Sequence, residues 1–325
     1  MAKAIRIHQT GGPEAMVWEE VEVPSPGAGE ALIRHTAVGV NFIDAYHRGG
    51  LYPLPALPHV LGMEAAGVVE AVGDSVVEVR PGDRVAYASL PVGAYAERRV
   101  MPAQRLVPLP DGIGDQQAAA MMLKGMTAQY LLRRTFPVSA GDTVLIHAAA
   151  GGVGLILCQW AKHLGATVIG TVGSDAKAAF AHAHGCDHTI VYTREDFVAR
   201  VRLLTEGEGV AVVYDSVGAD TFAGSLDCLR PMGMMVSFGQ SSGKVPPLDT
   251  GLLAAKGSLF LTRPTIMTYT ARRPDLMASA VELFDMVKRG FVTVEISAAY
   301  PLADAAQAHR DLEARRTTAS VVLLP

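Results

Sequence analysis

A glycine-rich segment between two apolar runs is the part of the chain whose spacing most directly indicates chemistry. Residues 143–146 form a short apolar run, small residues with Gly151 and Gly154 follow, and a helix-period segment then leads to a β-branched run at 167–172. This is the order strand, tight turn, helix, strand. Such a turn lets the backbone approach a pyrophosphate, which the N–H groups at the helix start can bind. Ala149 replaces the usual first glycine, so the surrounding order of elements carries the prediction more than the glycines do.

The residues after the run 167–172 indicate which dinucleotide is bound. An NAD site normally has an acidic side chain about twenty residues past the turn, where it holds the ribose 2′-hydroxyl. Gly173 takes that place here, while Ser174 and Lys177 can offer a donor and a positive charge to a 2′-phosphate. We therefore predict NADPH as the cofactor. Asp175 leaves an alternative open, because it either favours the dipole of the next helix or selects NAD.

Composition and charge exclude several classes of protein. Half of the residues are apolar and 18% are charged, which is typical of a globular chain. The net charge of −4 gives no basic footprint for nucleic acid and no polybasic membrane patch. No apolar run is long enough to span a bilayer, and the first residues resemble a strand rather than a signal peptide. We expect a soluble, cytoplasmic protein with a small-molecule substrate, and neither membrane attachment nor nucleic-acid binding.

The cysteines indicate neither a disulfide framework nor a thiolate zinc site. Cys158, Cys186 and Cys228 are scattered, and no two of them form a C-x-x-C pair. Cys158 lies on the helix after the glycine turn, where we expect a small buried apolar side chain rather than a reactive thiol.

Periodicity indicates the elements that must position these residues. Residues 1–124 contain mostly short strand-like runs separated by turn clusters. Residues 125–262 alternate between strands and helices, which is typical of a parallel sheet covered on both faces. Beyond Pro264 we expect a helix at 274–289, a strand at 292–296, a helix at 302–315 and a strand at 320–324.

The last elements are too small to form a core of their own, so we expect them to return to the N-terminal β domain. The predicted fold class is α/β, with two domains. Residues 1–124 and 265–325 form a β-rich catalytic domain, and residues 125–264 form a doubly wound parallel-sheet nucleotide-binding domain inserted between its two parts.

Motifs along the whole chain carry a family resemblance. They are GVNFIDAY at 39–46, GGLYP at 49–53, LGMEAAG at 61–67, KGMTA at 124–128, AAAGGVG at 148–154, YDSVG at 214–218, VSFG at 236–239 and TRP at 262–264. In this order they resemble the quinone oxidoreductase (zeta-crystallin-like) branch of the medium-chain dehydrogenase/reductase superfamily. The resemblance implies a GroES-like domain, a Rossmann domain, and NADPH bound through Gly173, Ser174 and Lys177.

The superfamily also contains zinc enzymes, and the sequence departs from their pattern. Asn41 stands where those enzymes have a cysteine, and Met63 stands where they have a histidine. No cysteine precedes Cys158, so the lobe that holds their structural zinc is missing. A thioether and an amide are poor zinc ligands. His47 and His59 flank the region and are interpreted as surface or packing residues, so we predict no metal site.

The resemblance also implies the residues that contact the cofactor, although core packing is the alternative for the apolar and aromatic ones. They are Asn41, Tyr46, Lys124, Thr127, Gly151, Gly152, Val153, Gly154, Gly173, Ser174, Lys177, Tyr192, Ser216, Phe238, Gly239, Gln240, Ser241 and Arg263.

Without a zinc ligand set, the chemistry must rest mainly on positioning a flat, electron-poor acceptor against NADPH. Quinones suit this, because the oxygens of the reduced product can take protons from water or a hydroxyl. Tyr46 and Tyr52, with Asn41, are the predicted catalytic residues. The tyrosines can hydrogen-bond an oxygen that gains charge, and the alternative is that they only shape the pocket.

The sequence therefore predicts an NADPH:quinone oxidoreductase that works without zinc. A reductase of enones or acrylates fits the same hydride transfer and stays open. A non-catalytic, zeta-crystallin-like RNA-binding role is a third possibility, against which the acidic balance argues.

The apolar run at 257–262 reads as a strand that could lie at an edge of the parallel sheet. Exposed edges pair with other strands unless they are covered. Because nucleotide domains of this superfamily commonly join edge to edge, we predict a homodimer through the Rossmann sheet edge.

Overall fold

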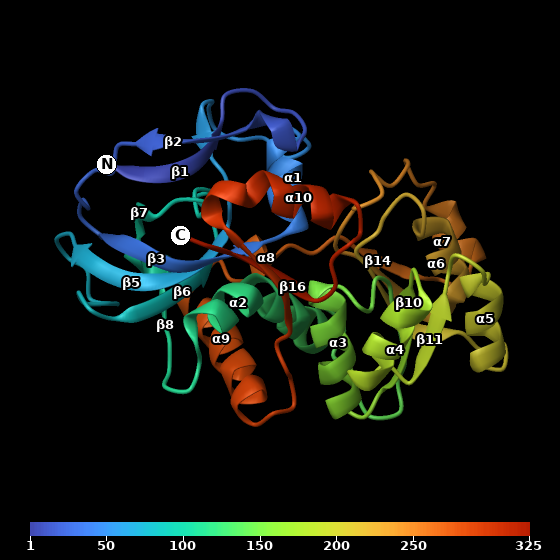
Figure 1. Cartoon of the computed structure of the whole chain (residues 1–325). Coiled ribbons are helices and arrows are strands. Elements are labelled where there is room, and N and C mark those ends of the chain that lie inside the picture. Colours follow the sequence, from blue (N-terminus) through green and yellow to red (C-terminus); the bar gives the residue numbers. More distant parts are fainter. The chain divides into compact units, whose positions relative to one another are not determined.

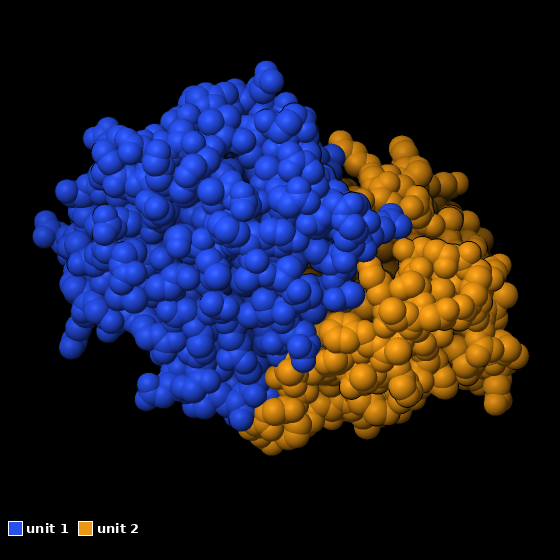
Figure 2. Space-filling view, in the orientation of Figure 1, with its two compact units in different colours: residues 1–126, 269–288, 294–325 blue, residues 127–268, 289–293 orange.

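The computed structural model describes all residues from 1 to 325, and they form two compact units. Unit 1 consists of residues 1–126, 269–288 and 294–325, and unit 2 of residues 127–268 and 289–293. Figure 1 shows the elements along the chain, and Figure 2 distinguishes the two units by colour.

Unit 1 is built on two sheets. The larger has the strand order β15-β16-β3-β5-β6-β8, with β7 also paired to β3, and the smaller has the order β2-β1-β4. The strands are β1 (Ala2–Ile7), β2 (Met16–Val21), β3 (Glu30–Val40), β4 (His59–Val60), β5 (Glu64–Val72), β6 (Arg84–Ala88), β7 (Arg98–Pro102), β8 (Val107–Pro108), β15 (Ile296–Pro301) and β16 (Ser320–Leu324). Its helices are α1 (Phe42–Arg48), α9 (Arg273–Lys288) and α10 (Ala305–Glu313), with 3-10 turns at Pro13–Ala15, Ala103–Arg105 and Leu302–Asp304.

The C-terminal segment completes the core of unit 1. β16 pairs antiparallel with β3, with Val322 opposite Gly39. Leu302, Val321 and Leu323 are buried in the same apolar cluster as residues of β1, β3 and β5. The last strand of the chain is therefore as much part of this β domain as the first.

Unit 2 contains a parallel sheet with the order β11-β10-β9-β12-β13-β14. The strands are β9 (Thr143–Ile146), β10 (Thr167–Val172), β11 (His188–Val191), β12 (Val210–Asp215), β13 (Leu229–Ser237) and β14 (Phe260–Thr262). The helices are α3 (Gly152–His163), α4 (Asp175–Ala183), α5 (Phe197–Leu204), α6 (Phe222–Cys228) and α7 (Gly251–Ala255), with a π-helical turn at Leu131–Thr135. α2 (Asp115–Tyr130) and α8 (Ile266–Tyr269) each have residues in both units.

Helices cover both faces of this sheet, with α3 and α4 on one and α5 and α6 on the other (Figure 1). Their apolar sides explain why the strands are almost continuously apolar, and β12 is buried along its whole length. The predicted doubly wound parallel sheet is confirmed. The strand order reverses between β9 and β12, which is where ligands bind in folds of this kind.

Two predictions about local structure have different outcomes. Cys158 is fully buried in α3, as expected for a small apolar side chain. The strand predicted at 292–296 is wrong, because β15 begins only at Ile296. The Gln159 side chain instead hydrogen-bonds both backbone groups of Thr293, accepting from its N–H at 2.8 Å and donating to its carbonyl at 3.1 Å.

No helix in the chain is long and apolar enough to cross a membrane.

Candidate functional site

The glycine turn between β9 and α3 leaves space for close backbone packing. Ala148 adopts a left-handed conformation with φ of 54°, which turns the chain sharply after β9. A Cβ atom on Gly154 would lie 2.2 Å from the Ala148 carbonyl oxygen, so only glycine fits. The N–H groups of Gly152, Val153 and Gly154 open α3, where a helix has no internal acceptors for them. The predicted glycine turn is thus present in backbone form, while its binding of an anion stays a prediction. The Ala149 side chain is fully buried and faces β10, since a Cβ on Gly170 would lie 2.6 Å from the Ala149 Cβ.

The end of β10 carries the residues predicted to distinguish the two nicotinamide cofactors. Ser174 is the N-cap of α4, and its hydroxyl accepts from the Lys177 N–H at 3.4 Å. A Cβ on Gly173 would lie 2.9 Å from the Tyr192 hydroxyl, which therefore lies directly against this strand end. Gly173, Ser174, Lys177 and Tyr192 are thus neighbours, although Tyr192 comes from the end of the next strand.

Asp175 has a partner that the sequence analysis missed. The Arg194 guanidinium contacts both Asp175 oxygens, with Nη1 2.7 Å from Oδ2 and Nη2 2.6 Å from Oδ1. These contacts lower the pKa of the Asp175 carboxyl. The charge of this carboxylate is therefore neutralised locally, which removes part of the objection to a 2′-phosphate nearby. The only sequence signal for Arg194 is that it follows a strand which must lie next to β10 in a parallel sheet.

A second loop cluster forms at the ends of β12 and β13. The buried Asp215 carboxylate accepts from the N–H groups of Val217 and Gly218 and from the Thr221 hydroxyl, at 2.7, 3.0 and 2.7 Å. The Phe238 and Gly239 N–H groups donate to the Asp215 carbonyl at 2.8 and 3.2 Å.

Ser216 lies within this cluster, since its carbonyl accepts from the Ser241 N–H at 3.2 Å. The predicted residues Ser216, Phe238, Gly239, Gln240 and Ser241 therefore belong to one loop cluster at the ends of β12 and β13, and β12 borders the point where the strand order reverses. Arg263 follows β14 and donates to the Ser237 carbonyl at 2.9 Å.

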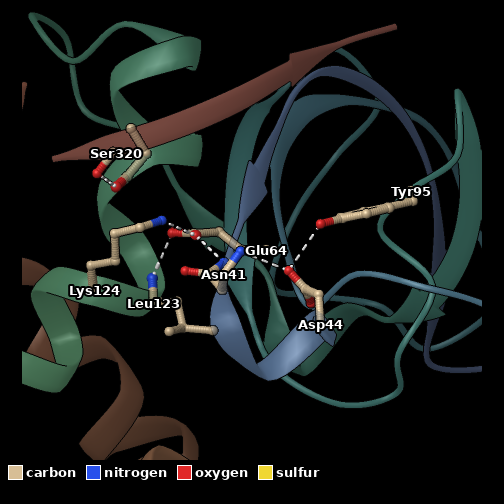
Figure 3. A network of polar contacts seen from close by, with 8 residues as sticks. Asn41, Asp44, Glu64, Tyr95, Leu123, Lys124 and Ser320 are labelled. Carbon is tan, nitrogen blue, oxygen red and sulfur yellow. Dashed lines mark hydrogen bonds and ion pairs between the residues drawn. The ribbon is translucent and has the colours of Figure 1, made fainter. Parts of the chain in front are cut away.

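Unit 1 contains a network of buried polar contacts centred on the Glu64 carboxylate, to which the sequence analysis gave no role. Glu64 is fully buried and accepts from the Asn41 amide at 2.8 Å, the Leu123 N–H at 2.7 Å and the Lys124 ammonium at 3.1 Å (Figure 3). Gly39 faces it across the β3–β5 pair, and a Cβ there would lie 2.3 Å from a Glu64 oxygen. The glycine of the GVN motif therefore makes room for this carboxylate.

These contacts fix two predicted cofactor residues. The Asn41 Nδ2 group is committed to Glu64, which leaves its Oδ1 oxygen as the acceptor end of the amide. Lys124 is buried on α2, one helical turn before Thr127, which is buried as well. The Ser320 hydroxyl donates to the Ala120 carbonyl at 2.8 Å and joins β16 to α2 (Figure 3).

The two predicted catalytic tyrosines lie together. The rings of Tyr46 and Tyr52 meet edge to face with centroids 5.2 Å apart, and the Tyr52 N–H donates to the Tyr46 carbonyl at 3.1 Å. Both side chains are half-buried. α1 carries Tyr46 and begins directly after Asn41, so one short helix positions two of the three predicted catalytic residues.

Comparison with known proteins finds relatives that match the chain along its whole length. The chain is 53% identical to the quinone oxidoreductase of Pseudomonas aeruginosa over all of both chains, and 49% identical to a 2-haloacrylate reductase of Burkholderia over 100% and 99% of the two chains. The crystal structure of Escherichia coli quinone oxidoreductase complexed with NADPH is 47% identical, covers all of both chains and has a TM-score of 0.98. Residues 27–111 match the alcohol dehydrogenase GroES-like domain, and residues 152–285 match the zinc-binding dehydrogenase family.

The chain belongs to the quinone oxidoreductase family. The family resemblance and the GroES-like and Rossmann architecture predicted from the motifs are both confirmed.

The side chains of this family member do not fit zinc, despite the name of the matching family. Asn41 is engaged with Glu64, and Met63 offers only a buried thioether. No three His, Cys, Asp or Glu side chains are placed so that they could share a metal ion. His47 is buried, and its ring packs edge to face on Tyr52 at 5.9 Å, which agrees with a packing role. The region therefore lacks a group of three imidazole, thiolate or carboxylate ligands placed to share a zinc ion, although the Glu64 carboxylate and the His47 imidazole are present.

Proposed function

We propose that this protein is an NADPH-dependent quinone reductase that transfers hydride without a metal ion. The observation that carries the proposal is its full-length likeness to quinone oxidoreductases, including one whose structure is a complex with NADPH. We assign NADPH binding to unit 2 and the reaction of the quinone to residues of unit 1.

The residues present in unit 2 fit the cofactor. The tight contact at Gly154 allows α3 to start against the turn, so that its first N–H groups can hold a pyrophosphate. Ser174 and Lys177 would recognise the 2′-phosphate with a hydroxyl and an ammonium at the end of β10. Arg194, after β11, would add a guanidinium whose charge the Asp175 carboxylate offsets. Asp175, paired with Arg194, would then interact favourably with the dipole at the start of α4 rather than select NAD.

The residues of unit 1 would orient the nicotinamide and the quinone. When bound, NADPH supplies the hydride. Glu64 holds Asn41 in one amide orientation, and Lys124 balances the Glu64 charge. Tyr46 and Tyr52 would donate hydrogen bonds to the quinone oxygen as it gains negative charge, which lowers the barrier by electrostatic stabilisation. The remaining contacts expected from the resemblance, at Thr127, Tyr192 and the Ser216–Ser241 loop cluster, complete the proposed cofactor set.

Steady-state kinetics with 1,4-benzoquinone test the proposal. NADPH should be oxidised with a higher kcat/KM than NADH. Tyr46→Phe and Tyr52→Phe should lower kcat more than they change KM, because the proposed hydrogen bonds strengthen in the transition state. Tyr300→Phe is a matched control, since that hydroxyl bonds only Asp311 on α10. If none of the quinones offered leads the purified protein to oxidise NADPH, the assignment is refuted.

Reduction of an activated double bond is the second candidate, favoured by the 49% identity to the 2-haloacrylate reductase. The same residues would then act on an enone or acrylate. The ratio of kcat/KM for 1,4-benzoquinone to that for a simple enone and for 2-chloroacrylate decides between the two substrates.

We further propose a cytoplasmic homodimer joined through β14. This strand is the last of its sheet, and Phe260 and Leu261 are 58% and 38% exposed on it. An apolar edge of this kind favours strand pairing with a second copy. Leu261→Lys should shift the sedimentation coefficient from dimer to monomer, and an unchanged dimer would refute this interface.

The three free cysteines are consistent with a reducing compartment such as the cytoplasm, which fractionation of cells would test.

A further inference from the structure

A run of four buried polar side chains in unit 1 has no part in the reaction as described so far. It consists of Arg48 and Asp44 on α1, His309 on α10 and Tyr95 in the segment before β7, and none is more than 4% exposed. Arg48 lies 2.9 Å from His309 Nδ1, His309 Nε2 lies 2.9 Å from the Tyr95 hydroxyl, and that hydroxyl lies 3.1 Å from Asp44 Oδ2. We call these four residues the Arg48–Asp44 chain.

The hydrogen bonds of this chain have one direction. A guanidinium has only donors, so Arg48 must donate and His309 Nδ1 must accept. Burial and the nearby Arg48 charge lower the pKa of His309 to about 3, so the imidazole is neutral and carries its proton on Nε2. That N–H donates to the Tyr95 oxygen, which leaves the Tyr95 hydroxyl to donate to Asp44.

The chain ends at the carboxylate that holds the start of α1. Asp44 Oδ2 also accepts from the Asn41 N–H at 2.9 Å, while Oδ1 is buried without a partner (Figure 3). The two donors, Tyr95 and Asn41, are therefore all the hydrogen bonding that this carboxylate receives. Asn41 in turn connects to Glu64 through its side chain.

We propose that Tyr95 and His309 are positioning residues for quinone reduction, which relay the hydrogen bonding of Arg48 to the Asp44 carboxylate and so keep Asn41 in its working orientation. The inference rests on the proposed function, since it assigns Asn41 to the reaction. When Asp44 gains a proton, its oxygen is a weaker acceptor for the Asn41 N–H, and the start of α1 loosens.

The electrostatics of the site make Asp44 the group that titrates near neutrality. Burial raises its pKa to about 7, while its hydrogen bonds from Asn41 and Tyr95 oppose this shift. The charged groups that face it are Glu64 of β5, which raises the pKa, and Lys124 of α2, which lowers it. Arg48 acts through the chain and also pairs with Glu313 of α10 at 2.6 Å. His47, on the same helix, has its pKa lowered to about 4 by burial and stays neutral.

The pH profile of kcat/KM tests the proposal, because it reports ionisations of the free enzyme. Wild-type activity should fall as the pH drops through the Asp44 pKa. Tyr95→Phe removes a donor to the charged form, so the acid limb should move upward by about one pH unit. Tyr87→Phe is a matched control, because Tyr87 is equally buried and bonds His35 at 2.9 Å, without contact to Asp44. Its acid limb should coincide with that of the wild type.

A rescue variant and a stability measurement complete the test. His309→Leu breaks the chain and should behave like Tyr95→Phe, whereas His309→Gln can accept from Arg48 and donate to Tyr95 and should restore the profile. By proton linkage, Tyr95→Phe should lower the urea midpoint more at pH 8 than at pH 5, while the loss in Tyr87→Phe should not depend on pH.

The possible failures are distinguishable. Identical acid limbs for wild type and Tyr95→Phe, with turnover intact, would overturn the positioning role. A pH-independent loss of stability in Tyr95→Phe would overturn the coupling of Tyr95 to Asp44. A wild-type protein that reduces no quinone would overturn the proposed function, and with it any role of the Arg48–Asp44 chain in that reaction.

Discussion

Lys124→Met should be among the most destabilising substitutions in unit 1, because it leaves the Glu64 carboxylate buried without its counter-ion. The two charges are 3.1 Å apart, and their side chains are 6% and 0% exposed. At an effective dielectric constant of about 20, unit charges at this distance attract each other by about 5 kcal/mol. Removing one partner of such a buried pair typically costs about 3–5 kcal/mol. We expect a loss in this range, somewhat moderated by the two N–H donors that Glu64 keeps.

A double-mutant cycle separates the pairing from the loss of packing. Glu64→Gln alone should also be destabilising, because it leaves the Lys124 ammonium buried without a counter-ion. The variant with both substitutions should lose about 1–3 kcal/mol less than the sum of the two single losses. Equilibrium urea unfolding, followed by far-UV circular dichroism, measures each free energy of unfolding.

The matched control is Lys3→Met, which removes a surface pair with Glu20 in the same unit, where the charged atoms are 3.8 Å apart. Its cost should be within about 1 kcal/mol. A double variant that loses at least the sum of the single losses would refute the reasoning, as would a Lys124→Met variant no less stable than the control.

Three further predictions concern the turn, the cofactor preference and the buried aspartate. Gly154→Ala should cost about 1–3 kcal/mol through overpacking and weaken NADPH binding in a fluorescence titration, whereas Gly114→Ala, with open space around its Cβ, should do neither. Arg194→Gln should lower the ratio of kcat/KM for NADPH to that for NADH several-fold and Asp175→Asn should raise it, and equal ratios would disprove the role of the pair. Because the pKa of Asp44 is raised from 3.8 to about 7, the folded protein holds a proton there that the unfolded chain has lost. The free energy of unfolding should therefore fall as the pH rises from about 4 to 7, by up to about 1.4 kcal/mol per pH unit. An Asp44→Asn variant with the same pH slope as the wild type would contradict this.

Features encoded by local pattern could be predicted from the sequence. The alternation of strands and helices indicated a parallel doubly wound sheet, and the glycine spacing located the turn between β9 and α3. The apolar run at 257–262 was predicted as an edge strand, and β14 is the last strand of its sheet. Each of these depends on backbone periodicity or on the size of one residue, and both are properties of a short segment.

The partners of the buried charges could not be predicted in this way. Glu64 and Lys124 are 60 positions apart, and Arg48 and His309 are 261 positions apart. The segment 292–296 looked like a strand because it is apolar and β-branched, yet its backbone bonds the side chain of Gln159 instead. Arg194 reaches Asp175 only because β10 and β11 are neighbours in the sheet.

The sequence by itself therefore determined the class of fold, the kind of cofactor and the absence of a zinc ligand set, since residue types and short spacings specify these. Only the tertiary structure decided that Asn41 is held between Glu64 and Asp44, and that Asp44 ends a chain that begins at Arg48. The physical reason is that a buried polar group must find its partners among whatever the packing brings near. Packing joins segments from opposite ends of the chain, a relation that no local pattern records.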